Sequence, residues 1–255
     1  MAADSSAIFR VVRLLEDISL RGGRIRYAQA AALLAPVSPN TVARLLSELC
    51  RVGVLERSRD RSYRLSEKPM FWAASVPRER DLRSLSRRQL VLLNRELEAT
   101  SCLVATYRGR LTILDRILDP MSPALMAPGS FRPISPLLMG GVFLAPRCDL
   151  DDPVIVARHL ARNPLTHIGV AAAQRLFARG IARGVVDDPG SCFRGLYRAY
   201  APVMAAGKVV ACIGIGAAAH RADRAFRRRA CDTVAAAASD LSQRLPAGAA
   251  GLRKL

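Results

Sequence analysis

The 255-residue chain lacks the residue clusters that metal sites, redox centres and hydrolytic active sites require. Its six cysteines form no CxxC pair, and its three histidines are scattered at positions 159, 167 and 220. This spacing argues against a zinc cluster or a dithiol centre. No Ser/His/Asp or Cys/His set can be assembled that would activate a nucleophile. We therefore expect no metal, no cofactor, no catalytic residues, and free thiols in a reducing cytosol.

Signals for secretion and for membrane insertion are lacking as well. Residues 1–12 contain no basic stretch followed by an apolar core. The one long apolar stretch, residues 199–219, contains Gly207 and Lys208 and divides better into two strands around a turn than into a membrane helix. We expect a cytoplasmic protein that does not contact a membrane.

Acidic residues are scarce relative to basic ones. There are 21 Asp and Glu against 39 Lys and Arg, which gives a formal net charge of +18. Residues 1–80 carry 14 basic and 8 acidic side chains, and residues 81–255 carry 25 and 13. Such an excess favours DNA, RNA or anionic membranes as partners, although a solvated basic surface would have the same charge.

Residues 38–51 have the pattern of a DNA recognition helix. Ser38 is a favourable N-cap, and Pro39 suits the first helical position because its missing N–H is not needed there. Apolar residues at 42, 45, 46 and 49 form one stripe. The opposite face carries side chains that can donate hydrogen bonds to phosphates or base edges.

A short, arginine-rich hairpin is expected directly after this helix. Gly53 ends the helix, residues 54–56 begin a strand, and residues 62–65 return. Together with helices expected over residues 8–18 and 27–34, this pattern predicts a winged helix-turn-helix over residues 1–66. The alternative is an ordinary small helical domain with a hairpin. The candidate DNA-binding residues are Ser38, Asn40, Thr41, Arg44, Ser47, Arg57, Arg59 and Arg61.

Residues 67–80 are expected to connect two domains. Pro69 and Pro77 interrupt any periodicity, while Phe71 and Trp72 suit packing between domains or against a second subunit. One winged helix reads few base pairs, so we expect a homo-oligomer, a dimer or a dimer of dimers, on a double-stranded DNA operator. Phe71, Trp72 and the face of Leu82 and Leu85 are the proposed contacts.

The remaining residues predict an α+β domain over 81–246, followed by a flexible tail over 247–255. Strands are expected at 101–107, 111–117, 184–187, 197–205 and 209–215, and helices at 81–99, 137–145, 153–162, 172–180 and 223–245. Residues 120–136 read as a loop. The basic cluster at 224–229 could bind DNA, but such a run is more often a solvated face or an oligomer contact.

Several motifs, in this order, resemble the IclR family of bacterial transcriptional regulators. They are SPNTVARLLSELCRVGVLER, PISPLLMGGVFLA, LFARGIARGVVDDPGSCFRGLYRAYAPV and GKVVACIGIGAAAHR. The resemblance covers most of the chain and implies an α+β protein: an N-terminal winged helix-turn-helix joined by a linker helix to a GAF/PAS-like effector-binding domain. It also implies a small-molecule effector.

The resemblance places the effector site on the loop before the short apolar helix, an acidic residue of the 187–188 pair, the strand after Gly195-Leu196, and the last hairpin strand. Apolar walls and a few polar groups are typical of such sites. The expected effector residues are Leu125, Met126, Gly129, Ile134, Ser135, Leu137, Leu138, Asp187, Arg198, Cys212, Gly214 and Gly216. Backbone N–H groups near Gly129 and Gly214 are expected to contribute donors.

The chain departs from the family pattern at the expected site. Gly141 stands where members often have lysine, and Gly214 and Gly216 stand where many have serines. Arg198 either clamps an anion through its planar guanidinium or points to solvent from an edge strand. Asp187 and Asp188 cannot form a facing acid–base pair, since neighbours on a strand point to opposite faces.

Three function classes remain open from the sequence. The first is a transcriptional regulator whose operator binding responds to a small organic effector, carboxylated or aromatic. The second is a ligand-binding module or enzyme that has acquired a helix-turn-helix. The third is a constitutive DNA-binding regulator with a non-functional pocket.

Overall fold

The computed structural model describes residues 6–75, 82–122, 126–138, 140–145, 148–162 and 166–245. The chain divides into two compact units, Met1–Val76 and Pro77–Leu255. Leu125 and the expected tail lie outside the described residues. The finer division into domain, linker and tail stays a prediction.

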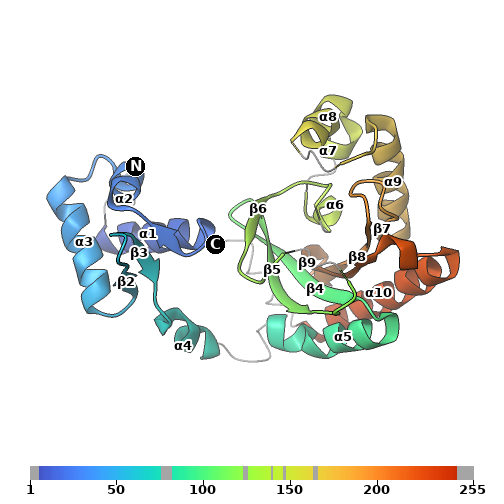
Figure 1. Cartoon of the computed structure of the whole chain (residues 1–255), viewed down its shortest axis with the longest axis horizontal. Coiled ribbons are helices and arrows are strands. Elements are labelled where there is room, and N and C mark those ends of the chain that lie inside the picture. Colours follow the sequence, from blue (N-terminus) through green and yellow to red (C-terminus); the bar gives the residue numbers. More distant parts are fainter. Residues whose placement is uncertain are drawn as a thin grey trace. The chain divides into compact units, whose positions relative to one another are not determined.

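The first unit contains three helices and a small antiparallel sheet, as the sequence predicts, followed by a short fourth helix (Figure 1). Its elements are α1 (Ala7–Leu20), β1 (Arg24–Ile25), α2 (Tyr27–Leu34), α3 (Pro39–Arg51), β2 (Leu55–Arg57), β3 (Tyr63–Leu65) and α4 (Lys68–Ala74). The strand order is β1-β3-β2. Strand β1 was not predicted, because two residues are too few to show an alternating pattern.

Apolar stripes from the three helices form the core of the first unit. Leu14 and Ile18 of α1, Leu34 of α2, and Val42 and Leu46 of α3 are all buried in one cluster. The buried stripe of α3 confirms the predicted periodicity, and the same geometry leaves its polar face exposed. Asn40, Arg44 and Ser47 lie on that exposed face.

The second unit is built on one six-stranded antiparallel sheet in the order β6-β5-β4-β9-β8-β7. Its strands are β4 (Thr100–Tyr107), β5 (Arg110–Ile117), β6 (Phe131–Pro133), β7 (Val186–Asp188), β8 (Leu196–Ala205) and β9 (Lys208–Ala218). Its helices are α5 (Leu82–Leu97), α6 (Gly141–Leu144), α7 (Cys148–Asp151), α8 (Pro153–Ala161), α9 (Val170–Arg183) and α10 (Arg224–Arg244), with a 3-10 turn at Ala219–Arg221. Strand β6 lies where a loop was expected, and helix α7 lies between two of the expected helices.

Helices α5 and α10 cover one face of this sheet, and α6 lies on the other (Figure 1). Successive residues of a strand point to opposite faces, so Ala199 and Ala201 pack toward α10 while Tyr200 packs toward α6. Helix α9 lies against the edge strand β7. Burial on both faces explains why β4, β8 and β9 read as continuous apolar runs.

Candidate functional site

The start of α3, the expected recognition helix, is fixed by Ser38. Its hydroxyl oxygen accepts a hydrogen bond from the Thr41 N–H at 3.3 Å and lies 2.9 Å from the Thr41 hydroxyl. The Tyr27 hydroxyl donates to the Pro39 carbonyl oxygen at 2.9 Å, which ties α2 to the first turn of α3. Ser38 and Thr41 therefore have a structural role in the helix cap, beside any role in binding.

The exposed face of α3 offers one unneutralised arginine. Among the described residues Arg44 has no ion-pair partner, whereas Arg51 pairs with Glu48 at 2.6 Å on the same helix. Asn40 and Ser47 are exposed beside it. A cation, an amide and a hydroxyl on one solvent-facing helix surface are the groups that read base edges in the major groove.

The turn between β2 and β3 exposes three arginines: Arg57, Arg59 and Arg61. Within the turn, the Asp60 carboxylate accepts hydrogen bonds from the Ser62 hydroxyl at 2.7 Å and the Ser62 N–H at 3.2 Å. These bonds lower the pKa of Asp60. The turn conformation is thus held by its own side chains, and the arginines are free to point outward.

Among the described residues, some arginines near this turn form ion pairs, and the arginines of the turn itself do not. Arg64 on β3 pairs with Glu56 at 2.8 Å, and Arg24 on β1 approaches Asp60 at 3.4 Å. The three turn arginines have no ion-pair partner within the described part of the chain. The hairpin tip and the exposed face of α3 therefore both carry positive charge that no described carboxylate neutralises, as expected for a surface that contacts phosphates.

The expected effector face is the α6 side of the sheet. Its buried cluster contains Cys102, Val104, Leu111, Ile113, Leu144, Tyr200 and Cys212. Met126, Ile134 and Leu138 are partly buried against it, so the structure brings these three predicted residues together with Cys212. The other predicted effector residues that the structure describes are not part of this cluster.

A buried thiol and phenol form the polar centre of this face. The Cys102 Sγ lies 3.2 Å from the Tyr200 Oη. Burial raises the pKa of the Cys102 thiol to about 11 and that of the Tyr200 hydroxyl well above its ordinary value. Both groups are therefore neutral and share a hydrogen bond inside the buried cluster.

Ser135, Leu137 and Gly129 use their polar groups within the chain. The buried Ser135 hydroxyl accepts from the Leu137 N–H at 3.2 Å. Leu137 packs in a separate cluster, with Val156 of α8 and Phe177 of α9. The Gly129 N–H donates to the Ile113 carbonyl oxygen at 3.1 Å, so the prediction of a free donor there was wrong.

Gly214 and Gly141 are required by close packing. A Cβ on Gly214 would overlap the Ala199 carbonyl oxygen and the Tyr200 ring. A Cβ on Gly141 would overlap the Ser135 carbonyl oxygen. The space that a side chain would occupy is thus filled by the protein itself. Gly216 pairs with Arg198 on β8 and with Thr100 on β4 within the sheet.

Arg198 is neither a free clamp nor a solvent-facing residue. Strand β8 lies between β9 and β7, and Arg198 is only 6% exposed. Its Nη2 donates to the Asp188 carboxylate at 2.8 Å, and its Nη1 donates to the Leu137 carbonyl oxygen at 3.0 Å. Its guanidinium carbon lies 4.6 Å from the Phe193 ring centroid. An anionic ligand would have to compete with Asp188 for this charge.

The Asp188 carboxylate also organises the following loop. Its Oδ1 accepts hydrogen bonds from the N–H groups of Gly190, Ser191 and Cys192 at 3.1, 2.8 and 3.1 Å. The loop after β7 is therefore built on this aspartate. The Nε of Arg198 is buried without a partner among the described groups.

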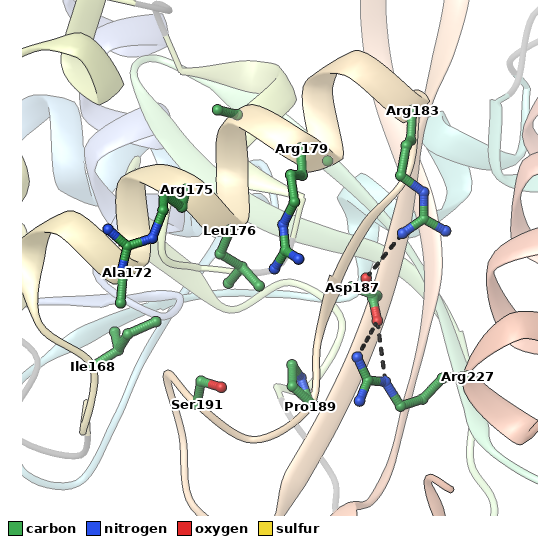
Figure 2. A pocket seen from close by; sticks show the side chains of 12 residues that line it. Ile168, Ala172, Arg175, Leu176, Arg179, Arg183, Asp187, Pro189, Ser191 and Arg227 are labelled. Atoms are coloured by element: carbon green, nitrogen blue, oxygen red, sulfur yellow. Dashed lines mark hydrogen bonds and ion pairs between the residues drawn. The ribbon is translucent and has the colours of Figure 1, made fainter. Parts of the chain in front are cut away.

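Asp187 faces away from the effector face. Its carboxylate pairs with Arg227 of α10 at 3.3 Å and with Arg183 of α9 at 3.7 Å. These residues line a groove of about 600 Å³ between α9 and the loop after β7 (Figure 2). Placing Asp187 in the effector site was therefore wrong, because the strand alternation gives that direction to Asp188.

The proposed dimer contacts divide into two groups. Leu82 is buried and Leu85 is packed on the core beneath the sheet, so the predicted contact face at these two leucines was wrong. Met70, Phe71 and Trp72 of α4 are 72%, 70% and 51% exposed. An apolar triplet of this kind, exposed on one short helix, is typical of a protein contact surface.

The described residues also bear on metal binding, thiol pairing and membrane insertion. Within the described ranges, no three His, Cys, Asp or Glu side chains are placed to hold a metal ion. The five cysteines whose side chains are described are unpaired. No helix of the described part is long and apolar enough to cross a bilayer.

No family model matches the sequence, and no curated protein matches it either. Solved structures share its fold at low sequence identity. A putative IclR transcriptional regulator from a Silicibacter species has a TM-score of 0.71 at 21% identity, covering 94% of this chain and 96% of its own. An IclR regulator from Alicyclobacillus acidocaldarius has a TM-score of 0.69 at 18% identity, covering 94% of this chain and 98% of its own. An IclR homologue from Microbacterium hydrocarbonoxydans, complexed with 4-hydroxybenzoate, has a TM-score of 0.67 at 20% identity, covering 94% of this chain and 99% of its own. The chain therefore has the fold of IclR-family regulators along nearly all its length.

Proposed function

We propose that this protein is a sequence-specific DNA-binding transcriptional regulator of the IclR type, and not an enzyme. One observation carries the proposal: the arginines of α3 and of the β2–β3 turn that lack ion-pair partners coincide with the surface that a winged helix presents to DNA. The fold shared with regulators over 94% of the chain supports the same conclusion.

The dimensions of α3 suit this role. Its 13 residues span about 20 Å, and a helix of ordinary diameter fits the major groove of B-DNA. Arg44 and Asn40 would meet base edges, while Arg57, Arg59 and Arg61 would meet phosphates. A single reading head covers few base pairs, so we propose a dimer or a dimer of dimers with α4 at a subunit contact.

The second unit would bind a small organic effector, aromatic or carboxylated, on the α6 side of the sheet. Support comes from the apolar cluster around Cys102, Tyr200 and Cys212, with Met126, Ile134 and Leu138 at its border. The related fold from Microbacterium hydrocarbonoxydans is complexed with an aromatic carboxylate. Binding can alter DNA affinity only by the difference in effector affinity between two arrangements of the reading heads.

Two observations favour a constitutive regulator as the alternative. The Tyr200 ring fills the space beside Gly214, and Asp188 already neutralises Arg198. Both features reduce the donors and the volume that an anionic effector could use.

Selection of bound sequences from a random DNA library tests the DNA-binding proposal. The expected result is an enriched sequence with two half-sites, protected in a footprint by the full chain. Recovery of random sequences alone would contradict sequence-specific binding. Repeating the footprint with 4-hydroxybenzoate, benzoate and neutral phenol then separates the two alternatives. A responsive regulator changes its operator affinity with an aromatic compound, and a constitutive one shows the same affinity throughout.

A further inference from the structure

The groove between α9 and the loop after β7 has an unusual concentration of arginines. Arg175, Arg179 and Arg183 lie four residues apart on α9, so they share one helix face, and Arg227 joins them from α10 (Figure 2). Asp187 is the only carboxylate that lines the groove as described. Four guanidiniums and one carboxylate leave a local charge of +3.

The single carboxylate is already shared by two of these arginines. Asp187 accepts from Nε and Nη2 of Arg227 at 3.3 Å and lies 3.7 Å from Arg183. Arg175 and Arg179 have no ion-pair or hydrogen-bond partner among the described residues. Like charges four residues apart slightly oppose helix formation, and an anion in the groove would reduce this repulsion.

Close packing holds this charged face in place. Gly180 lies so near β7 that a Cβ there would overlap the side chain of Val186. The opposite side of α9 is anchored by buried Ala173 and Phe177. The backbone of α9 is therefore held close to β7, while its arginine side chains are exposed. Figure 2 shows Arg179 pointing toward the loop with Pro189 and Ser191.

We propose that this groove binds a small polyanion, an organic phosphate or polycarboxylate with anionic groups about 6 Å apart. That separation is the rise of four residues along a helix and therefore the spacing of successive arginines. Guanidinium groups bind phosphate and carboxylate in the same forked geometry. Ile168, Leu176 and Pro189 supply apolar wall for the carbon skeleton, and the Ser191 hydroxyl a further donor.

The shape of the site favours a small molecule over nucleic acid. A volume of about 600 Å³ lies within the range of small-ligand sites. The proposal does not depend on the DNA-binding function, since the groove lies wholly in the second unit and its ligand is tested without DNA. It also differs from the effector face, which lies on the other side of β7.

Titration calorimetry of the full chain at constant ionic strength tests this site, with sodium tripolyphosphate and citrate as the probes. We expect saturable one-site binding, and the tighter probe identifies phosphate or carboxylate as the preferred group. Arg179→Gln should raise Kd about tenfold or more, because it removes a charge-assisted contact. Arg95→Gln, on an exposed position of α5, is the charge-matched control and should change Kd less than twofold.

Several results would overturn the proposal. They are the absence of saturable binding to either probe, an equal loss in Arg179→Gln and Arg95→Gln, and displacement of the probe by random-sequence duplex DNA at similar charge concentration. A change of oligomeric mass in Arg179→Gln without probe binding by the wild type would identify the face as a subunit contact instead. Thermal melting followed by circular dichroism verifies that both variants are folded.

Discussion

The guanidinium of Arg198 and the carboxylate of Asp188 form a buried ion pair between adjacent strands, with Nη2 2.8 Å from Oδ2. The side chains are 7% and 2% exposed. Asp188 in turn holds three backbone N–H groups of the following loop. This pair therefore joins β7, β8 and the loop that borders the arginine groove.

Removing one partner of this pair should be strongly destabilising. Arg198→Ala leaves a buried carboxylate without its cation, and we expect a loss of about 3–5 kcal/mol in the free energy of unfolding, measured by urea titration. Arg227→Gln is the control, because its pair with Asp187 is more exposed and should contribute about 1 kcal/mol or less. Similar losses in the two variants would show that the Arg198 pair is not a buried structural element.

Arg44 and Arg59 should affect DNA binding in different ways. Arg44→Ala should cost about 1–3 kcal/mol on the selected operator and relax its sequence preference, since the residue would contact base edges. Arg59→Ala should weaken all sequences alike and reduce the salt slope by about one, since it would contact a phosphate. Fluorescence anisotropy at several salt concentrations measures both effects. An operator affinity unchanged in both variants would refute the proposed interface.

The exposed aromatic pair on α4 should support oligomerisation. Changing Phe71 and Trp72 together to serine removes two large apolar side chains from a contact surface, so the population should shift toward monomer. Size-exclusion chromatography with light scattering reports the mass. Met121→Ser, at a 76% exposed position in the second unit, should leave the mass unchanged. An unaltered mass in the double variant would place the subunit contact elsewhere.

Gly141 should not tolerate even one methyl group. Its added Cβ would overlap the Ser135 carbonyl oxygen, so Gly141→Ala should cost about 1–3 kcal/mol through overpacking. Gly169→Ala is the control, because no atom lies within 4 Å of the new Cβ and φ is −78°. Thermal and urea unfolding of both variants give the comparison. Equal stability would mean that the loop before α6 adjusts freely.

Buried thiols should make stability fall at alkaline pH. The Cys102 pKa is about 11 in the folded protein against an ordinary value of 9, because burial disfavours the thiolate. The unfolded state therefore loses its proton first. The contribution of Cys102 is full below pH 9 and is lost as pH rises toward 11, by roughly 1 kcal/mol for each unit between the two values. Urea unfolding from pH 7.5 to 10.5 should show a shallower decline for Cys102→Ala than for the wild type. An equal decline in stability with pH in the wild type and in Cys102→Ala would show that groups other than Cys102 cause it.

Local patterns were sufficient for most of the helices and for the long strands. Capping at Ser38, the apolar stripe of α3 and the apolar runs of β8 and β9 depend on neighbours within a few residues, and the structure agrees with them. Strand β1 and strand β6 have two and three residues and exist only because a distant strand pairs with them. Such short segments have no periodicity from which a strand could be recognised.

The exposed polar face of α3 was also determined by the sequence, because a buried apolar stripe on a helix leaves its opposite side in solvent. The partners of Arg198, Asp187 and Leu82 were decided only by the tertiary structure. Arg198 meets Asp188 because β7 and β8 pair in one register, and Asp187 meets Arg227 because α10 packs beside that edge. The arginine groove has the same origin: the spacing on α9 is local, but the facing loop and Arg227 come from segments that only folding brings together.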